Sequence, residues 1–370
     1  MKVFVIGSRG FPNALGGIEK HCEELYSRLS EYPEMDIYVF AMKKYTPNKH
    51  KTWHQIKFIY IDSINIKGIE KLYYGIKSTI LAIFMRPDIV HYQGLNCAIY
   101  IPLARLFGLK VVYTQHSMDY NYPTWSRFAK YVLRMSEKSA LYANQLISVS
   151  TSIYKHLKQY TNNVVIIKNG VSFQTETPST KVTQFILNIY HIKADHYILF
   201  VGRFTKEKAI EDLLNAYAGM DISYKLVIVG DVDHNNSYSR MIKQKIMETP
   251  NVIWTGFIYG ETLQVILMNT HMFILPSKFE GTPLVLLEAM SYGVKILASN
   301  ISSNRQIRLE NECYFRQGNV EDLRQKMSYL LNRKQDEKIK NSRINILKQE
   351  YNWDIITKKH YEIYKKVVNL

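Results

Sequence analysis

The chain has 370 residues and a formal net charge of +16, with 48 Lys and Arg against 32 Asp and Glu. Hydrophobic residues make up 46% of it and charged residues 22%, which excludes bulk disorder, and the length exceeds what one hydrophobic core usually serves, so two domains are expected. The positive charge favours polyanions, phosphorylated small molecules or an anionic membrane surface as partners.

The amino terminus enters a predicted strand directly. KVFVIG, at 2–7, lacks the long apolar stretch and the cleavage site of a secretory signal, so we expect a cytoplasmic protein. The longest apolar run, TILAIFM at 79–85, is far shorter than the roughly 20 residues that a membrane-spanning helix needs. The three cysteines are widely separated and are expected to be reduced and buried.

Strands and helices alternate along residues 1–170. Apolar strands are expected at 2–7, 36–41, 56–61, 88–93, 110–115, 146–151 and 164–169, with helices at 17–30, 69–85 and 125–142. Continuously apolar strands joined by helices predict a parallel sheet covered on both faces. The polar segment 171–181 that follows has little to bury and is the predicted linker.

A second series of strands begins after the linker. These strands are expected at 197–203, 225–231, 251–256, 271–277 and 294–299. The predicted fold class is therefore α/β, with two doubly wound, Rossmann-like domains in series. Such sheets place ligands outside the carboxyl ends of their strands, so the chemistry is expected in the loops there. The helical tail, 351–370, needs an apolar surface for Trp353.

The loop after the strand at 271–277 is the strongest candidate site. It presents Glu280 and then a helix for which Thr282 is the predicted cap, with Pro283 in the first turn. The first N–H groups of a helix favour an anion such as a diphosphate. Phosphate would repel Glu280 and Glu288, so both are expected to accept hydrogen bonds from hydroxyls, as sugars provide. The alternative is a solvated Glu280 and a Glu288 on an ordinary amphipathic helix.

A cationic turn follows the strand at 197–203. Arg203 offers a planar fork and Lys208 a compact charge, a combination that can neutralise a leaving diphosphate without a metal. The alternative is that both pair with acidic neighbours on the surface, namely Glu207, Glu211 or Asp212.

The first half carries weaker signals. The glycines around Gly16 and Gly17 lack the dinucleotide G-x-G-x-x-G spacing, which argues against a nicotinamide enzyme, although the pair can let a phosphate or sugar approach the backbone. His116 follows a strand end and could donate to a sugar hydroxyl or a developing charge, but a lone His is often structural. Asp231 and Asp233 form an Asp-x-Asp match too short to predict a metal site, and no metal is expected.

Four segments together resemble the retaining, nucleotide-sugar-dependent glycosyltransferases of the fourth family, which have the GT-B fold. They are GGIEKH, VGRFTKEKAIEDLLNA, WTGFIYGETL and FEGTPLVLLEAMSYGVKILAS, in that order. The resemblance covers essentially the whole chain. It implies two Rossmann-like domains facing a central cleft, with a terminal helix that crosses back onto the first domain. The opening 25 residues are further similar to a bacterial subgroup that adds rhamnose or related sugars during surface-polysaccharide assembly.

The resemblance also implies roles for the candidate residues. Arg203 and Lys208 hold the diphosphate, Glu280 contacts the transferred sugar, Glu288 binds the ribose hydroxyls, and His116 lies against the sugar. The remaining donor-binding positions are Gly16, Gly17, Gly256, Phe257, Gly281, Thr282 and Leu284. Residues 1–170 form the acceptor-side domain, 171–350 the donor-binding domain and 351–370 the returning helix, with neither metal nor cofactor. Two departures from the family pattern are Ala209, where Gly is usual, and Lys295, where Pro is usual.

The expected acceptor is a lipid-linked saccharide for O-antigen or capsule. Residues 120–138 interleave aromatic with basic side chains and can lie on an anionic bilayer, which would make the protein peripheral to the inner face of the plasma membrane. An ordinary core-facing helix with a basic edge is the alternative. Three other functions stay open: a nucleotide-sugar epimerase of the same fold, a catalytically silent scaffold and, from charge alone, a nucleic-acid-binding protein, although no nucleic-acid motif is present.

Overall fold

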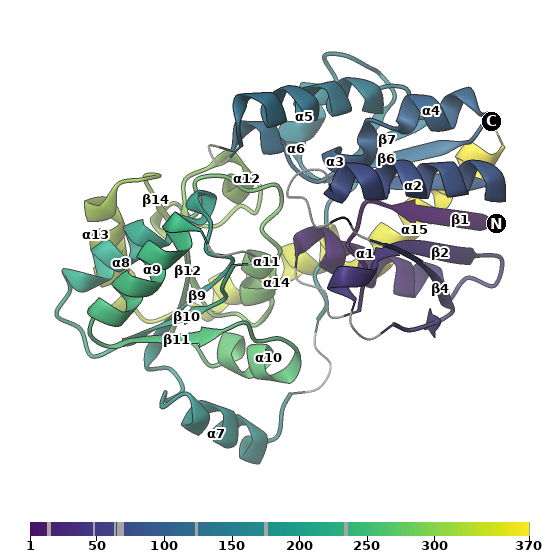
Figure 1. Cartoon of the computed structure of the whole chain (residues 1–370). Coiled ribbons are helices and arrows are strands. Elements are labelled where there is room, and N and C mark those ends of the chain that lie inside the picture. The colour runs from purple at the N-terminus through teal and green to yellow at the C-terminus, as the bar shows by residue number, and fades with distance from the viewer. Residues whose placement is uncertain are drawn as a thin grey trace. The chain divides into compact units, whose positions relative to one another are not determined.

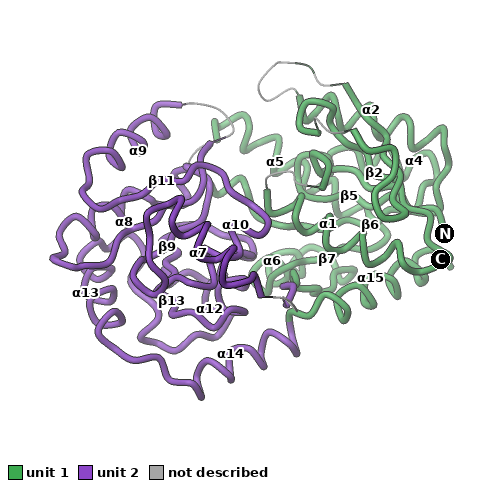
Figure 2. Tube along the Cα trace, turned by 90° about the horizontal axis from the view of Figure 1, so that it is seen from below, with its two compact units in different colours: residues 1–170, 351–370 green, residues 171–350 purple. Residues whose placement is uncertain are grey.

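The chain forms two compact units. A computed structural model describes residues 1–12, 16–46, 49–62, 64, 70–122, 125–173, 177–232 and 236–369. Unit 1 comprises Met1–Gly170 and Tyr351–Leu370, and unit 2 comprises Val171–Glu350 (Figure 2). The carboxyl-terminal segment therefore belongs to the same unit as the amino terminus.

Unit 1 is built on an eight-stranded sheet of order β3-β4-β2-β1-β5-β6-β7-β8 (Figure 1). Its strands are β1 Lys2–Ile6, β2 Asp36–Met42, β3 Thr52–Trp53, β4 Ile56–Ile61, β5 Ile89–Gln93, β6 Val111–Gln115, β7 Gln145–Ser148 and β8 Val164–Ile166. All neighbours pair in parallel except β3 and β4, which are antiparallel. The seven predicted strands are confirmed, whereas the two-residue β3 was not predicted because it is too short to show a pattern.

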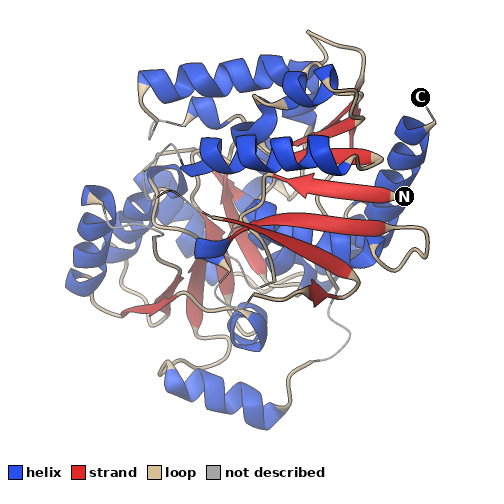
Figure 3. Ribbon diagram, turned by 45° about the vertical axis from the view of Figure 1, so that its right-hand side comes forward, coloured by secondary structure: helices blue, strands red, loops and turns tan. Residues whose placement is uncertain are grey.

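Helices cover both faces of this sheet (Figure 3). They are α1 Gly17–Leu29, α2 Glu70–Met85, α3 Leu95–Ala98, α4 Ile101–Leu106, α5 Arg127–Ala140, α6 Thr151–Leu157 and α15 Trp353–Val368, with 3₁₀ turns at Lys43–Tyr45 and Asp119–Asn121. Alternate strand residues point to opposite faces, so Phe4 and Ile6 pack in the core beneath α2 to α6, while Val3 and Val5 pack in the core beneath α1 and α15.

The terminal helix α15 packs on unit 1, as predicted. Trp353, Ile356 and Tyr364 are buried in the core that α15 shares with α1. The Trp353 ring lies directly on Gly170, where an added Cβ would meet the ring at 2.5 Å. Gly170 is the last residue of unit 1 before the chain enters unit 2, and only a glycine at this position leaves room for the Trp353 ring.

Unit 2 contains a six-stranded, wholly parallel sheet of order β11-β10-β9-β12-β13-β14. Its strands are β9 Tyr197–Val201, β10 Lys225–Val229, β11 Val252–Gly256, β12 Met272–Leu275, β13 Lys295–Ser299 and β14 Tyr314–Phe315. The short β14 was not predicted. Three helices pack against one face: α8 (Ile210–Ala218) through Leu213, α9 (Ser237–Glu248) through Ile242 and α13 (Val320–Leu331) through Leu323.

The helices of unit 2 are α7 Thr180–Ile189, α8 Ile210–Ala218, α9 Ser237–Glu248, α10 Gly260–Met268, α11 Leu284–Ser291, α12 Ser302–Arg305, α13 Val320–Leu331 and α14 Glu337–Glu350, with 3₁₀ turns at Lys206–Lys208 and Asn311–Cys313. Helix α7 begins inside the predicted linker, because the Ser179 side chain accepts a hydrogen bond from Val182 N and caps it. Residues 174–176 of that linker lie outside the described residues. Within the described part of the chain, no helix combines the length and apolar character needed to span a bilayer.

Candidate functional site

The carboxyl edge of the unit 2 sheet gathers most of the predicted site residues. Arg203 follows β9, Gly256 ends β11, and Glu280 lies in the loop after β12. Because β9, β10, β11 and β12 are parallel, these loops leave the same edge of the sheet. Gly16, Gly17 and His116 belong to the corresponding edge of unit 1, after β1 and β6.

The two strongest sequence signals meet in one ion pair. Lys208 Nζ lies 2.5 Å from Glu280 Oε1, and Ser277 Oγ donates to the same oxygen at 2.6 Å. The two charged side chains are only 17% and 10% exposed, which limits screening by water. Among the described residues both contacts reach Oε1, so Oε2 is the oxygen that Glu280 can offer to a ligand hydroxyl.

The alternative pairing of Lys208 with the nearby acids is wrong. It is Lys278 that takes two of them, with Nζ 3.1 Å from Asp212 and 3.5 Å from Glu211. Its backbone N–H also donates to the Glu207 carbonyl at 2.7 Å, which ties the loop after β12 to the turn before α8. These contacts hold the two loops together and leave Lys208 directed at Glu280.

Helix α11 begins differently from the prediction. Its cap position is Pro283, with φ −77°, and no side chain caps the helix, so the expected cap at Thr282 is wrong. The helix begins at Leu284, which places Thr282 one residue too early for its hydroxyl to act as the cap. Leu286 N–H already donates to Pro283 O at 3.0 Å, so the N–H groups of Leu284 and Val285 are the ones in this first turn that could meet an anion. Glu288, one turn further on, is half-buried between buried apolar neighbours, so it is not a solvated surface carboxylate.

The backbone conformation at Ala209 explains why the family usually has glycine at this position. It has φ 50° and ψ 42°, the left-handed conformation, at the junction between the 3₁₀ turn of Lys208 and α8. Glycine adopts this conformation without strain, which accounts for the usual glycine here. The alanine keeps the turn, and its methyl group is fully buried.

In unit 1, Gly16 is the N-cap of α1 and Gly17 is its first residue, and the two glycines differ in which substitutions they tolerate. Gly16 has φ +145°, and a Cβ there would lie 2.0 Å from the Glu19 carboxylate, whereas a Cβ at Gly17 would meet nothing within 4 Å. Glu19 is buried and accepts a hydrogen bond from Arg9 N at 3.1 Å. Gly16 is therefore required by the fold, and Gly17 is not.

This difference makes Gly17→Ala a test of function rather than of folding. We expect its free energy of unfolding to stay within about 0.5 kcal/mol of wild type, since space is open and alanine favours a helix. If donor phosphates approach this backbone closely, the KM for donor should rise about tenfold, which corresponds to about 1.4 kcal/mol. Gly16→Ala is the control, for which thermal unfolding should show a clear loss of stability. An unchanged KM in Gly17→Ala would remove Gly17 from the donor site.

His116 is buried and neutral. Burial, followed by the neighbouring His360, lowers its pKa to about 3. Its Nε2 lies 2.8 Å from Gln93 Oε1, and its ring meets His21 edge-on at 4.7 Å between centroids. Nε2 therefore donates to Gln93 rather than to the sugar hydroxyl or developing charge considered from the sequence. Gln93 and His21 were not predicted, since nothing in the sequence shows that they face His116.

The chain offers no obvious metal centre where it is described. No cluster of three His, Cys, Asp or Glu side chains within the described ranges is suited to a metal ion. Asp231 pairs with Lys243 at 2.8 Å, and Asp233 lies outside those ranges. Cys22, Cys97 and Cys313 are free and buried, as predicted.

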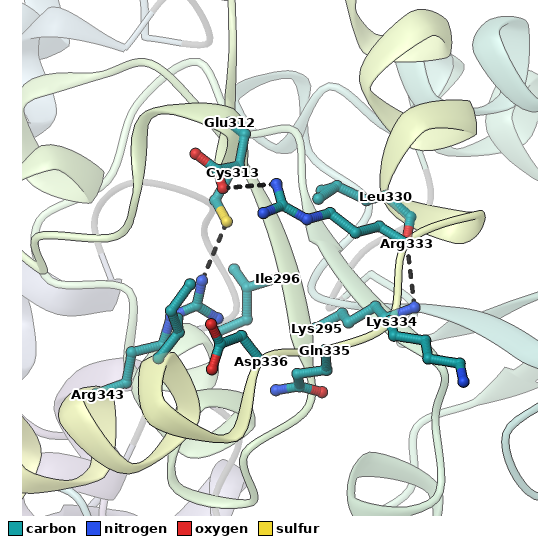
Figure 4. Close-up of a pocket in the computed structure, with 11 residues that line it drawn as sticks. Lys295, Ile296, Glu312, Cys313, Leu330, Arg333, Lys334, Gln335, Asp336 and Arg343 are labelled. Atoms are coloured by element: carbon teal, nitrogen blue, oxygen red, sulfur yellow. Dashed lines mark hydrogen bonds and ion pairs between the residues drawn. The ribbon is translucent and has the colours of Figure 1, made fainter.

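A separate pocket lies at the amino edge of the unit 2 sheet (Figure 4). Lys295, the first residue of β13, donates to Leu330 O at 3.2 Å and lies 2.9 Å from His271 Nε2, and its burial lowers the pKa of the amine. Arg333 pairs with Glu312 at 3.0 Å. Lys295 and Arg333 are therefore already engaged, and the lysine that stands where proline is usual lines this pocket.

Comparison with known proteins identifies the group. Residues 15–175 match the family model described as Glycosyltransferase Family 4, and residues 184–346 match the model described as Glycosyl transferases group 1. The chain belongs to the glycosyltransferases. The first match falls within unit 1 and crosses into the linker, and the second falls within unit 2.

Relatives of this glycosyltransferase occur in polysaccharide synthesis. It is 26% identical over 251 residues to an uncharacterized 41.2 kDa protein of the cps region of Klebsiella pneumoniae, covering 65% of this chain and 67% of that one. It is 23% identical over 223 residues to the capsular polysaccharide biosynthesis glycosyltransferase CapM of Staphylococcus aureus, covering 55% and 57%. The structure of Anabaena HepE in complex with UDP and glucose superposes with a TM-score of 0.80 at 16% identity, covering 99% and 100%, which establishes the GT-B fold.

Proposed function

We propose that this glycosyltransferase moves a sugar from a nucleotide diphosphate sugar to a lipid-linked saccharide during the synthesis of bacterial O-antigen or capsule. The observation that best supports this proposal is the Lys208–Glu280 pair. It places a cation next to a carboxylate that can accept a hydrogen bond from a hydroxyl, at the carboxyl edge of the unit 2 sheet. A diphosphate needs the first and a sugar the second. The UDP complex of HepE supports a nucleotide donor, and CapM supports a polysaccharide product.

The reaction we propose retains the anomeric configuration and needs no metal. The bond between the anomeric carbon and the donor phosphate oxygen breaks, the acceptor oxygen bonds to the same face of that carbon, and the departing phosphate takes the acceptor proton. Charge that develops on the diphosphate is met by Arg203, Lys208 and the first N–H groups of α11, a preorganised contribution of several kcal/mol. Glu280 holds a sugar hydroxyl, and Glu288 holds the ribose. We further propose rhamnose or a related sugar as the group transferred.

The comparisons give no support to an epimerase or to a nucleic-acid-binding protein. A direct test of the donor is thermal unfolding against a panel of UDP-, GDP- and dTDP-sugars in the presence of EDTA. At a concentration 100 times its Kd, a bound donor adds about 2.7 kcal/mol of stability. For a unit of this size we expect a rise in Tm of about 5 to 10 °C. A flat response to the whole panel would contradict the proposed function.

We also propose that α5 rests on an anionic membrane. Its N-cap Ser126 accepts from Ala129 N at 3.2 Å, and its buried face carries Leu133 and Ala140. The opposite side exposes Phe128 by 76% and Tyr131 by 61%, which an ordinary solvated basic edge would not do. The basic residues of this face are Arg127, Lys130, Arg134 and Lys138. Aromatic side chains can enter the interface while the cations meet the headgroups.

Neighbouring helices that cover the same face of the sheet also expose apolar side chains. Phe84 at the end of α2 is 78% exposed, and Leu106 and Phe107 at the end of α4 are 81% and 46% exposed. Arg86 Nη1 donates to Phe107 O at 2.8 Å and ties these two helix ends together. The exposed apolar side chains and the basic residues therefore come from adjacent helices of unit 1, namely α2, α4 and α5.

Removing charge from α5 should weaken binding to anionic vesicles. Each basic residue near such a surface contributes about 1 kcal/mol, so Arg127→Gln with Lys138→Gln should lower the partition coefficient about thirtyfold. The matched control is Lys358→Gln with Lys359→Gln, two exposed lysines on α15, which covers the other face of the sheet. Co-sedimentation with phosphatidylglycerol vesicles measures both. Equal losses in the two double variants would show that only net charge matters and would contradict docking through α5.

A further inference from the structure

Unit 1 buries a hydrogen-bonded set of polar side chains behind His116, which we call the relay: Tyr26, His91, Gln93, Thr114 and Tyr364. Four histidines are at most 7% exposed, and they come from four separate elements: His21 from α1, His91 from β5, His116 from the edge after β6 and His360 from α15. Burial lowers the pKa of each, so all four rings are neutral. A neutral imidazole carries one N–H, and the hydrogen bonds around it decide which nitrogen holds the proton.

His91 lies at the end of the relay that is farthest from His116. The hydroxyls of Tyr26 and Tyr364 lie 2.8 and 2.6 Å from its Nδ1, and its Nε2 lies 2.8 Å from Thr114 Oγ1. The Tyr26 and Tyr364 hydroxyls are also hydrogen-bonded to each other, so one phenol can donate to the other phenol's oxygen while that second phenol donates to the single lone pair of Nδ1. A proton on Nδ1 would leave one phenol proton without an acceptor in this group. Nδ1 of His91 is therefore unprotonated, and Nε2 carries the proton and donates to Thr114.

Gln93 connects this group to His116. It is 1% exposed at the end of β5, and its Nε2 donates to the Tyr26 hydroxyl at 2.7 Å. With the amide nitrogen directed at Tyr26, the amide oxygen faces His116 Nε2 at 2.8 Å. A carbonyl oxygen can only accept, so His116 must carry its proton on Nε2, and its Nδ1 must be a bare lone pair.

We infer that Gln93 is a positioning residue, itself held by Tyr26, which fixes His116 as the Nε2–H tautomer so that Nδ1 accepts a hydrogen bond from a hydroxyl of the bound sugar. This assignment rests on the proposed function for the identity of the ligand. The tautomer of His116 does not depend on the proposed function, because it is a property of the free protein. His116 thus selects a ligand that presents an O–H donor at this point and disfavours a carbonyl or carboxylate oxygen there.

Nitrogen-15 NMR of the full chain labelled in histidine tests the tautomer directly, because protonated and bare ring nitrogens resonate far apart. His116→Gln assigns the signals. In wild type we expect Nε2 of His116 to be protonated and Nδ1 bare, whether or not donor is present. In Gln93→Leu and in the nearly isosteric Tyr26→Phe, we expect signals averaged between the two tautomers. Tyr361→Phe is the matched control, since its hydroxyl lies on α15 but contacts Glu34 instead of the relay, and it should keep the wild-type pattern.

Steady-state kinetics supply the second readout. Because each relay variant loses one well-oriented hydrogen bond, we expect kcat/KM to be about tenfold lower in Gln93→Leu and in Tyr26→Phe. We expect kcat/KM of the control Tyr361→Phe to equal that of wild type. A wild-type His116 protonated on Nδ1, or a tautomer unmoved by both relay variants, would overturn the inference. If the wild type transferred no sugar yet showed the expected tautomer and its loss in the variants, the relay would stand and the proposed function alone would fail.

Discussion

Replacing Lys208 with alanine should lower kcat/KM for sugar transfer by about 10²- to 10³-fold, the cost of removing one preorganised group that stabilises developing charge. Lys208 lies 2.5 Å from Glu280 in a pair that is mostly shielded from water. On the proposed function, its loss removes the cation that meets the leaving diphosphate, and it leaves the Glu280 carboxylate with the Ser277 hydroxyl but without its cationic partner. The effect should appear chiefly in kcat, because the charge develops as the bond breaks.

The matched control for this prediction is Lys278→Ala. Lys278 lies on the same loop as Glu280, but its ammonium contacts Glu211 and Asp212 instead. We expect both variants to lose some stability and only Lys208→Ala to lose most of its activity. Steady-state rates measured well below the melting temperature of each variant separate the two effects. Equal activities in the two variants would show that Lys208 has only a structural role.

Gly230→Ala should lower the free energy of unfolding by about 3 kcal/mol, since strain and a backbone clash coincide there. Gly230 has φ +129°, and its Cβ would lie 2.0 Å from the carbonyl oxygen of Gly202. Both glycines follow neighbouring strands, so the clash cannot be relieved without separating the ends of β9 and β10. For a unit of about this size, the Tm should fall by about 6 to 12 °C.

Gly256→Ala separates strain from clash in that experiment. Gly256 also has a positive φ, +71°, but nothing lies within 4 Å of an added Cβ. Its loss of stability should therefore be no more than about 1 to 2 kcal/mol, the cost of a left-handed alanine. Differential scanning calorimetry of the two variants beside wild type makes the comparison. Losses of equal size would show that the approach of Gly230 to Gly202 is not tight in solution.

Much of the fold could be predicted because its strands are long apolar runs that report burial on both faces. The sequence did not reveal β3 or β14, since two residues carry no periodicity. The helix at 284–291 was predicted, but its cap was placed on Thr282, because the residue preference for a cap shifts easily by one position.

The candidate site was predictable as a set of residues and not as a set of contacts. The sequence pointed to Lys208 and to Glu280 separately, 72 positions apart, but the choice of Glu280 over the nearer acids follows from the parallel order of β9 and β12. The relay behind His116 was hidden for the same reason. It joins α1, β5 and α15, and Tyr364 lies 273 positions from His91, so only folding reveals it.

The central claim is transfer of sugar from a nucleotide diphosphate sugar to a lipid-linked saccharide. The most direct measurement incubates the purified protein with a radiolabelled donor and a lipid-linked acceptor in EDTA, and then counts the label in the organic phase. We predict labelled lipid that depends on both protein and acceptor, that is lost in Lys208→Ala and that carries the donor's anomeric configuration. Label confined to the aqueous phase with every donor that the protein binds would contradict the account.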